Sequence, residues 1–166
     1  MSELLSTTIS SPIGKLYLLS RGDTVLGLNL SGFQDLLSSL SERELAEKIG
    51  KAKSAPGITE KILDYFDGDL KAINSIKVKQ PGGDFSQAAW ASMRKIKAGS
   101  MESYAELAYR AGSPAAVRAA GSACAKNKIA VIIPCHRIIK SGGAIGAYGW
   151  GVNKKIWLLE HEGALS

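Results

Sequence analysis

The sequence has little cysteine, little histidine and no long apolar run. Its 166 residues include two cysteines, Cys124 and Cys135, and two histidines, His136 and His161. Two thiols cannot form a disulfide framework, and they fit a reducing compartment. The adjacent Cys135 and His136 do not have the spacing of zinc ligands, so we expect no metal site.

Membrane and export signals are also missing from the sequence. No apolar run approaches the roughly 20 residues that a transmembrane helix requires. The first residues lack the basic and then apolar layout of a secretory signal peptide. We therefore expect a cytoplasmic protein with no membrane contact. With 45% hydrophobic and 22% charged residues, the chain has enough apolar material for one core or two small domains.

Negative charge is scarce in the second half of the chain. Residues 1–83 contain 10 Lys and Arg against 10 Asp and Glu, whereas residues 84–166 contain 11 against 5. The net charge of +6 therefore lies entirely in the C-terminal half. Clustered positive charge favours a polyanionic partner such as nucleic acid. A solubilising surface would explain the charge equally well, so charge alone does not decide between them.

A turn cluster in "KVKQPGGDF" predicts a linker near residues 80–84. We predict an α/β domain over residues 1–80 and a mostly helical domain over residues 84–166. In the first domain, "GKLYLLS" and "TVLGLNL" flank the turn "RGD" and predict a hairpin. Residues 33–50 are helix-prone, and residues 57–67 predict a helix with an apolar face formed by Ile58, Ile62 and Phe66.

Local signals divide the C-terminal half into short helices. Residues 84–87 and 103–106 fit capping boxes, each followed by an apolar stripe. Ser113 fits an N-cap followed by Pro114 at the first helical position. The helix that follows Pro114 and the one before it are joined by a Gly-containing turn. Together they predict a helix-turn-helix.

The second of these helices carries one arginine among small residues. Val117, Ala120 and Cys124 are placed to face a core. The opposite face holds Arg118 and its small neighbours, which are Ala115, Ala119 and Ser122. Such a face suits close contact with DNA, and Lys126 and Lys128 follow at its end. The alternative is an alanine-rich helix chosen for propensity, with Arg118 merely solvated.

The stretch "VIIPCHRII" places a thiol beside an imidazole. A thiol becomes a strong nucleophile when a histidine can accept its proton and a carboxylate orients that histidine. His136 follows Cys135, and Glu162 lies on a terminal helix predicted from Asn153 to Gly163. The alternative is an inert buried thiol with a surface histidine and a solvated carboxylate. The basic helix-turn-helix directly before these three residues favours the chemical interpretation.

These motifs closely resemble the O6-alkylguanine-DNA alkyltransferases, a family also called methylated-DNA–protein-cysteine methyltransferases. The resemblance rests on "SYAELA", "SPAAVRAAGSACAKN", "IPCHRII", "GAIGAYGWG" and "WLLEHEG", which follow in order within residues 84–163. The segment "SPIGKLYLLSRGDTVLGLNL" is similar to the family's more variable N-terminal domain. The resemblance implies a ribonuclease-H-like N-terminal domain, a winged helix-turn-helix C-terminal domain, no cofactor and a monomer.

The resemblance also implies DNA repair by direct reversal. The protein would bind double-stranded DNA and rotate O6-alkylguanine, or O4-alkylthymine, out of the stack. Cys135 would accept the alkyl group once and irreversibly. His136 would act as its base through a water molecule, and Glu162 would orient His136. Tyr104 would assist rotation and donate to the leaving guanine, while Asn127 would tie the recognition helix to the active-site turn.

Contacts to DNA and to the flipped base are implied for further residues. Arg118 would enter the duplex from the minor groove in place of the extruded base. The other implied DNA contacts are Ser113, Ala119, Ser122, Lys126 and Tyr104. The base pocket would be lined by Cys124, Ile138, Tyr148, Gly149 and Trp150. Because Trp150 replaces a residue that is often small, we expect bulky alkyl groups to fit poorly.

Three rival functions account for less of the sequence. A non-catalytic lesion-binding relative would usually lack the cysteine of this motif. A Cys-His hydrolase would leave the Arg118 helix and the basic half without a role. A DNA-binding regulator would leave Cys135 and Glu162 unexplained. The sequence therefore favours the alkyltransferase.

Overall fold

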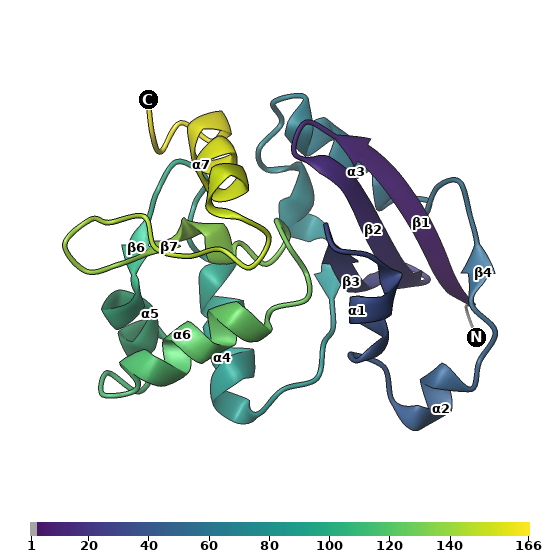
Figure 1. Cartoon of the computed structure of the whole chain (residues 1–166), viewed down its shortest axis with the longest axis horizontal. Helices are drawn as coiled ribbons and strands as arrows, with labels where there is room; N and C mark the ends of the chain where they lie inside the picture. Colours follow the sequence, from purple (N-terminus) through teal and green to yellow (C-terminus); the bar gives the residue numbers. More distant parts are fainter. Residues whose placement is uncertain (1–2) are drawn as a thin grey trace. The chain divides into compact units, whose positions relative to one another are not determined.

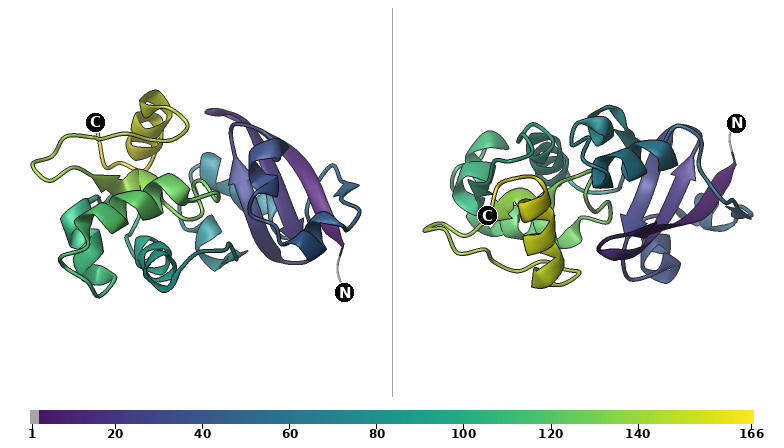
Figure 2. Two further views of the ribbon diagram at one scale, coloured as in Figure 1. Left: turned by 60° about the horizontal axis from the view of Figure 1, so that its bottom comes forward. Right: turned by 90° about the horizontal axis from the view of Figure 1, so that it is seen from above.

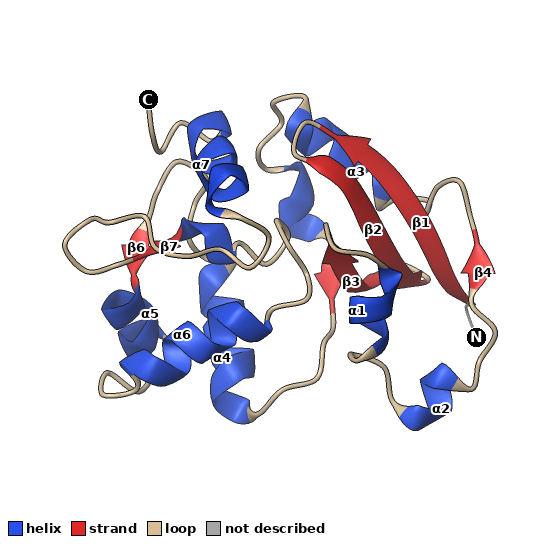
Figure 3. Ribbon diagram, viewed as in Figure 1, coloured by secondary structure: helices blue, strands red, loops and turns tan. Residues whose placement is uncertain are grey.

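The computed structural model describes residues 3–166, which form two compact units. The first unit contains the residues up to Pro81 together with Lys128–Ile132, and the second contains Gly82–Asn127 and Ile133–Ser166. The first is built on a β-sheet, whereas the second is mostly helical (Figures 1 and 3). Within the described residues, no helix has the length and apolar character needed to cross a membrane.

A five-stranded mixed sheet forms the first unit, with strand order β4-β1-β2-β3-β5. The central three strands are antiparallel, and the two short edge strands run parallel to their neighbours. The predicted hairpin around "RGD" is confirmed, since Arg21 pairs with Thr24 across a turn in which Gly22 has a φ of 58°. The strands are β1 (Leu4–Ser11), β2 (Gly14–Arg21), β3 (Thr24–Asn29), β4 (Gly50–Lys51) and β5 (Lys77–Val78).

Helices cover both faces of this sheet (Figure 2). On one face, Leu36 of α1 (Phe33–Leu37) packs over Gly27, where a Cβ atom would lie 2.7 Å from the leucine. On the other, α3 (Thr59–Phe66) buries Ile62 and Phe66 as predicted. A 3₁₀ turn, η1, spans Ala72–Ser75. The helix-prone stretch 33–50 forms two short helices because a capping box at Ser41 starts α2 (Glu42–Leu45) separately.

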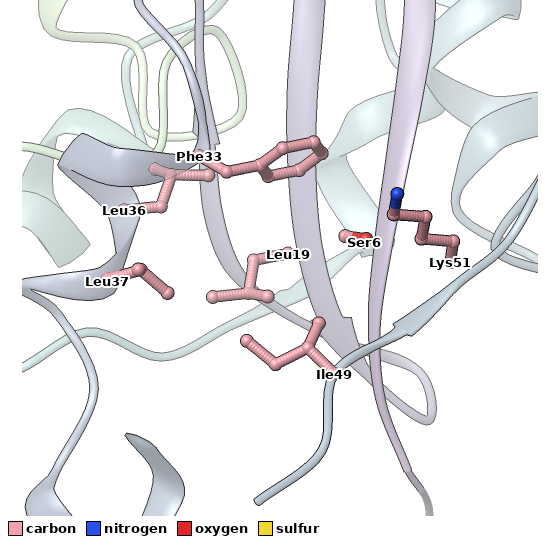
Figure 4. A pocket seen from close by; sticks show the side chains of 7 residues that line it. All are labelled: Ser6, Leu19, Phe33, Leu36, Leu37, Ile49 and Lys51. Atoms are coloured by element: carbon pink, nitrogen blue, oxygen red, sulfur yellow. The ribbon is translucent and has the colours of Figure 1, made fainter. Parts of the chain in front are cut away.

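A cavity of about 240 Å³ lies beside α1 in the first unit (Figure 4). Its walls are mainly apolar, and Lys51 lies at one side of it. The lining residues are Ser6, Leu19, Phe33, Leu36, Leu37, Ile49 and Lys51. None of the residues that the sequence singled out for chemistry lines this cavity.

Four α-helices, a 3₁₀ helix and a two-stranded parallel sheet make up the second unit. The sheet pairs Glu102 with Ile138 and Ser103 with Ile139, so it brings the start of α5 beside the segment that follows Cys135. Trp90 donates a 2.9 Å hydrogen bond from its ring to the Ala123 carbonyl and joins α4 to α6. The elements are α4 (Asp84–Met93), β6 (Glu102–Ser103), α5 (Tyr104–Arg110), α6 (Val117–Lys126), the 3₁₀ helix η2 (Cys135–Arg137), β7 (Ile138–Ile139) and α7 (Val152–His161).

The predicted capping of these helices is right at one place and wrong at another. The box formed by Ser103 and Glu106 at the start of α5 is confirmed, with both reciprocal hydrogen bonds present. Asp84 and Gln87 form no such box, because Gly83 occupies the N-cap of α4 and Asp84 is already helical.

The helix predicted from Pro114 begins three residues later, at Val117. Gly112 and Ser113 instead close α5 in a Schellman arrangement: the Gly112 amide donates to the Tyr109 carbonyl and the Ser113 amide to the Ala108 carbonyl, both at 3.0 Å. The N-cap of α6 is Ala116, so Ser113 lies before that helix and does not cap it. Val117 was predicted to face the core, but it is 40% exposed at the first position of α6.

Segment Lys128–Ile132 joins the first unit although it follows α6 in the chain. The Leu28 amide donates to the Lys128 carbonyl at 2.9 Å, and the Ala130 amide donates to the Leu28 carbonyl at 2.8 Å. Val131 then adopts a φ of 69°, which a β-branched residue rarely does and which costs about 1–3 kcal/mol. Strained backbone thus lies four residues before Cys135.

Candidate active site

Cys135 begins the 3₁₀ helix η2, directly after Pro134, and is only 5% exposed. Asn127, at the end of α6, lies beside it. The Asn127 side-chain amide donates to the Ile133 carbonyl at 2.9 Å and contacts the Cys135 sulfur at 3.4 Å. Burial raises the pKa of the Cys135 thiol, whereas the Asn127 amide and the Lys155 ammonium act in the opposite direction. The protein therefore supplies two groups that favour the thiolate within an apolar setting.

His136 and Glu162 form a buried pair below this turn. The His136 Nε2 and a Glu162 carboxylate oxygen lie 2.8 Å apart, and both side chains are fully buried. Burial lowers the pKa of His136 despite the opposing effect of Glu162, so the ring is neutral near pH 7. With Nε2 donating to the carboxylate, Nδ1 is an acceptor, and it has no hydrogen-bond partner within residues 3–166.

Arg137 completes this cluster and was missed by the sequence analysis. Its guanidinium donates two hydrogen bonds to the Glu162 carboxylate, at 2.9 and 2.8 Å, and a third to the Ile96 carbonyl at 2.7 Å. Burial alone would raise the pKa of Glu162, but the hydrogen bonds from His136 and Arg137 outweigh it and hold that pKa well below its usual range. Glu162 is therefore an anion that orients His136.

A cavity of about 250 Å³ opens beside Cys135 in the second unit. Three of the residues predicted for the base pocket, Cys124, Tyr148 and Gly149, line this cavity. Ile138 and Trp150, also predicted to line the pocket, are not among the lining residues. Trp150 packs edge-on to Tyr148 with ring centroids 5.2 Å apart. The cavity is lined by Tyr104, Gly121, Cys124, Ala125, Cys135, Ala147, Tyr148 and Gly149.

Two polar groups in this cavity are held in their neutral forms. Burial raises the pKa of Tyr104, with smaller contributions from Cys124 and Cys135. Burial also raises the pKa of Cys124, and Cys135 reinforces the effect. Tyr104 therefore keeps its hydroxyl proton near neutral pH and can donate it to a bound group. Cys124 remains a thiol and is a poor nucleophile.

Apart from Tyr104, which begins α5, the residues predicted to contact DNA lie on α6 and in the turn before it. Arg118, Ser122 and Lys126 repeat every four residues along α6, and all three are exposed. Ala119 is half-buried, and Ser113 is half-buried in the turn that closes α5. Arg118 thus extends into solvent from the same helix that contributes Gly121, Cys124 and Ala125 to the cavity.

Comparisons with known proteins agree on one family. Residues 84–164 match the family model of the 6-O-methylguanine DNA methyltransferase, DNA binding domain. The methylated-DNA–protein-cysteine methyltransferase of Salmonella typhimurium is 33% identical over 170 residues, which cover 99% of each chain. The curated enzyme of the same name from Mycobacterium tuberculosis is 35% identical over 155 residues, 93% of this chain and 90% of that one.

Solved structures agree with the sequence comparison. The crystal structure of Mycobacterium tuberculosis OGT in complex with DNA superposes with a TM-score of 0.79 at 33% identity, covering 96% of this chain and 93% of that one. The O6-methylguanine-DNA methyltransferase of Pyrococcus kodakaraensis shares the fold, with a TM-score of 0.66 at 22% identity and coverage of 96% and 99%.

The comparisons, together with a sheet unit and a helical unit, show that the protein is a DNA alkyltransferase. The chain belongs to the methylated-DNA–protein-cysteine methyltransferase family.

Proposed function

We propose that this protein repairs O6-alkylguanine in double-stranded DNA by moving the alkyl group to Cys135. One observation carries the proposal. Cys135 lines a cavity and directly precedes His136, whose ring is paired with the buried carboxylate of Glu162. Transfer forms a bond from sulfur to carbon while the bond from carbon to O6 breaks. The resulting thioether is stable, so each molecule acts once. The same transfer to Cys135 removes the alkyl group from a second substrate, O4-alkylthymine.

Two proton transfers accompany this step. The thiol proton passes through a bridging water to Nδ1 of His136, the acceptor that lies opposite the Glu162 contact. The guanine leaves as a neutral base after taking a proton from the Tyr104 hydroxyl. Return of the proton from the imidazolium to the phenolate restores both side chains. Asn127 holds the turn in place and favours the thiolate through its contact with sulfur.

DNA recognition is assigned to α6, the turn before it and Tyr104 at the start of α5. Arg118 fills the space of the extruded base, and Ser122 and Lys126 contact the backbone together with Ser113, Ala119 and Tyr104. Tyr104 also assists rotation of the nucleotide. The cavity beside Cys135 receives the base, with Cys124, Tyr148 and Gly149 as walls. The Gly149 amide faces O6. The Ile138 carbonyl, which the resemblance assigns to the guanine amino group, lies outside the cavity lining and accepts a hydrogen bond from Lys155. Trp150 restricts bulky alkyl groups through its contact with Tyr148.

The finer architecture and the biological setting belong to the same proposal. The helix pair α5–α6 with the β6–β7 sheet acts as a winged helix-turn-helix, and the first unit is a ribonuclease-H-like domain. In functional terms, residues 1–80 form one domain, and residues 84–166 form the domain that binds DNA and accepts the alkyl group.

The protein works as a cytoplasmic monomer without a cofactor. Within residues 3–166 no group of three or more His, Cys, Asp or Glu is arranged to hold a metal ion.

Intact-protein mass spectrometry tests the proposed reaction. The protein is mixed with duplex DNA that contains one O6-methylguanine, and its mass is compared with that after mixing with unmodified duplex. We expect a gain of one methyl group per molecule, mapped by peptide analysis to Cys135. Tight binding to the lesion without a change in mass would instead identify a non-catalytic lesion-binding protein.

Arg118→Ala separates recognition of DNA from the chemistry. We expect methyl transfer from duplex DNA to slow by about 100-fold, because base extrusion costs a few kcal/mol and then lacks its inserting side chain. Transfer from the free base O6-methylguanine should change little. Lys97→Ala removes the same charge from another exposed position of the second unit and serves as the control. Equal losses on duplex and free base would rule out an inserting role for Arg118.

A further inference from the structure

Lys155 is a lysine with no exposed surface, which is rare for this residue type. It lies on α7, one turn before Leu158 and Leu159, in a row of buried positions. Its ammonium donates to the Ile138 carbonyl at 2.6 Å and to the Ala147 carbonyl at 3.2 Å. A buried ammonium costs several kcal/mol unless it is hydrogen-bonded, so these contacts explain how the charge is tolerated. They do not explain why a charge is present there.

The two carbonyl groups belong to the two segments that enclose the proposed active site. Ile138 follows η2 directly and starts β7. Ala147 lies on the glycine-rich loop that joins β7 to α7, and it lines the cavity next to Tyr148 and Gly149. One ammonium therefore connects the turn that carries Cys135 to the loop that forms a wall of the cavity.

Gly146 lies on the same loop, close to both the Lys155 ammonium and Tyr104, which lines the cavity beside Cys135. A Cβ atom at Gly146 would lie 3.7 Å from the Lys155 ammonium and 3.6 Å from the Tyr104 hydroxyl. The backbone there has a φ of 81°, which suits glycine. The Lys155 ammonium and the Tyr104 hydroxyl thus both lie against the same loop residue.

The charge of Lys155 also acts on the thiols. Burial raises the pKa of Cys135, and the ammonium is one of the groups that oppose this rise. It has the same effect on Cys124. Burial lowers the pKa of Lys155 itself, while the two cysteines act in the opposite direction. A cation near the sulfur favours the thiolate, which is the reacting form.

We propose that Lys155 is a positioning residue for alkyl transfer, which holds the cavity loop against the Cys135 turn and favours the thiolate through its charge. The inference rests on the proposed function of Cys135 and adds a residue to it. Lys155 makes no bond to the substrate. It acts by fixing the Ala147 carbonyl, and with it the neighbouring amides of the loop, relative to the sulfur.

Two substitutions separate the charge of Lys155 from its geometry. Lys155→Gln removes the charge but keeps a hydrogen-bond donor, whereas Lys155→Arg keeps the charge on a longer, planar group. Lys154→Gln removes the same charge from the preceding, half-buried position on α7 and is the matched control. Circular dichroism and thermal unfolding first establish that each variant is folded.

Two reactions of Cys135 are then measured on each full-length variant. The first is alkylation by iodoacetamide, a small uncharged reagent, as a function of pH. The second is methyl transfer from duplex DNA with one O6-methylguanine. For Lys155→Gln we expect the iodoacetamide profile to move to higher pH and the methyl transfer to slow by about 100-fold, since small displacements of reacting groups cost that much. For Lys155→Arg we expect an unchanged profile and a transfer slowed by about 10-fold. Lys154→Gln should match the wild type.

Each outcome decides one part of the inference. A wild-type pH profile in folded Lys155→Gln would contradict the electrostatic part, and wild-type transfer by Lys155→Arg would contradict the geometric part. If Lys155→Gln does not fold, the transfer by Lys155→Arg alone decides. If the wild-type protein takes no methyl group from DNA, the proposed function is wrong, while the iodoacetamide profiles still test the effect of Lys155 on the thiol.

Discussion

Replacing Cys135 by serine is expected to abolish methyl uptake, whereas replacing Cys124 by serine leaves the methyl group on Cys135. Both thiols line the same cavity, but they differ in their neighbours. Cys135 precedes His136 and contacts the Asn127 amide, whereas the Lys155 ammonium acts on both thiols. Cys124 lies within α6, which contains no histidine. Burial also raises its pKa strongly.

The measurement is the stoichiometry of methyl incorporation from duplex DNA that carries one O6-methylguanine. The Cys124→Ser variant should gain one methyl group at Cys135, whatever its rate. The Cys135→Ser variant should gain none, because serine has a hydroxyl that is far less acidic than a thiol. Methylation of Cys124 in the Cys135→Ser variant would show that the cavity, rather than the histidine pair, selects the acceptor.

Glu162→Ala is expected to destabilise the protein by about 3–5 kcal/mol, because it leaves the buried guanidinium of Arg137 without its counter-charge. It also removes the partner of the His136 ring, so methyl transfer should slow markedly in whatever fraction remains folded. Urea unfolding at pH 7 measures the stability. Glu160→Ala, at an exposed position on the same helix, should change stability by no more than about 0.5 kcal/mol.

The same carboxylate makes stability depend on pH in a defined direction. The folded pKa of Glu162 lies below its ordinary value of 4.5, so its contribution is present above that pH and is lost as the pH falls further. The folded pKa of His136 lies below 6.5, so the unfolded chain takes up a proton first as the pH falls through that value. The wild type should therefore lose stability on acidification from about pH 6.5 downwards. Glu162→Ala should lose the part of this dependence that falls below pH 4.5, and an unchanged profile would contradict the ion pair.

Some of the features set by neighbouring residues were predicted correctly from the sequence. The hairpin around Gly22 and the capping box of Ser103 depend on turn chemistry and on a donor three residues away. The predicted start of α6 at Pro114 was wrong because Pro114 and Ala115 form a turn of their own and the helix begins at Val117. A single-residue capping signal cannot show that such a turn intervenes.

The candidate site was predicted in part for the same reason. Cys135 and His136 are neighbours in the chain, and Glu162 was placed below them through the predicted terminal helix. Arg137 and Lys155 were overlooked because charged side chains are usually exposed, and nothing local distinguishes these two. Each is buried only because acceptors from distant segments surround it: Ile96 and Glu162 for Arg137, and the Ile138 and Ala147 carbonyls for Lys155.

The sequence by itself determined the chemistry available to this protein. It placed all the excess positive charge in the half with the helix-turn-helix, and it supplied a thiol, an imidazole and a carboxylate in a family-specific order. Only the tertiary structure decided how that chemistry is supported. Burial makes unpaired charge costly, so the fold had to bring together a carboxylate with a guanidinium and an ammonium with two carbonyl groups around Cys135. Those partners lie up to 25 residues apart in the chain, and their meeting is a property of the packed unit.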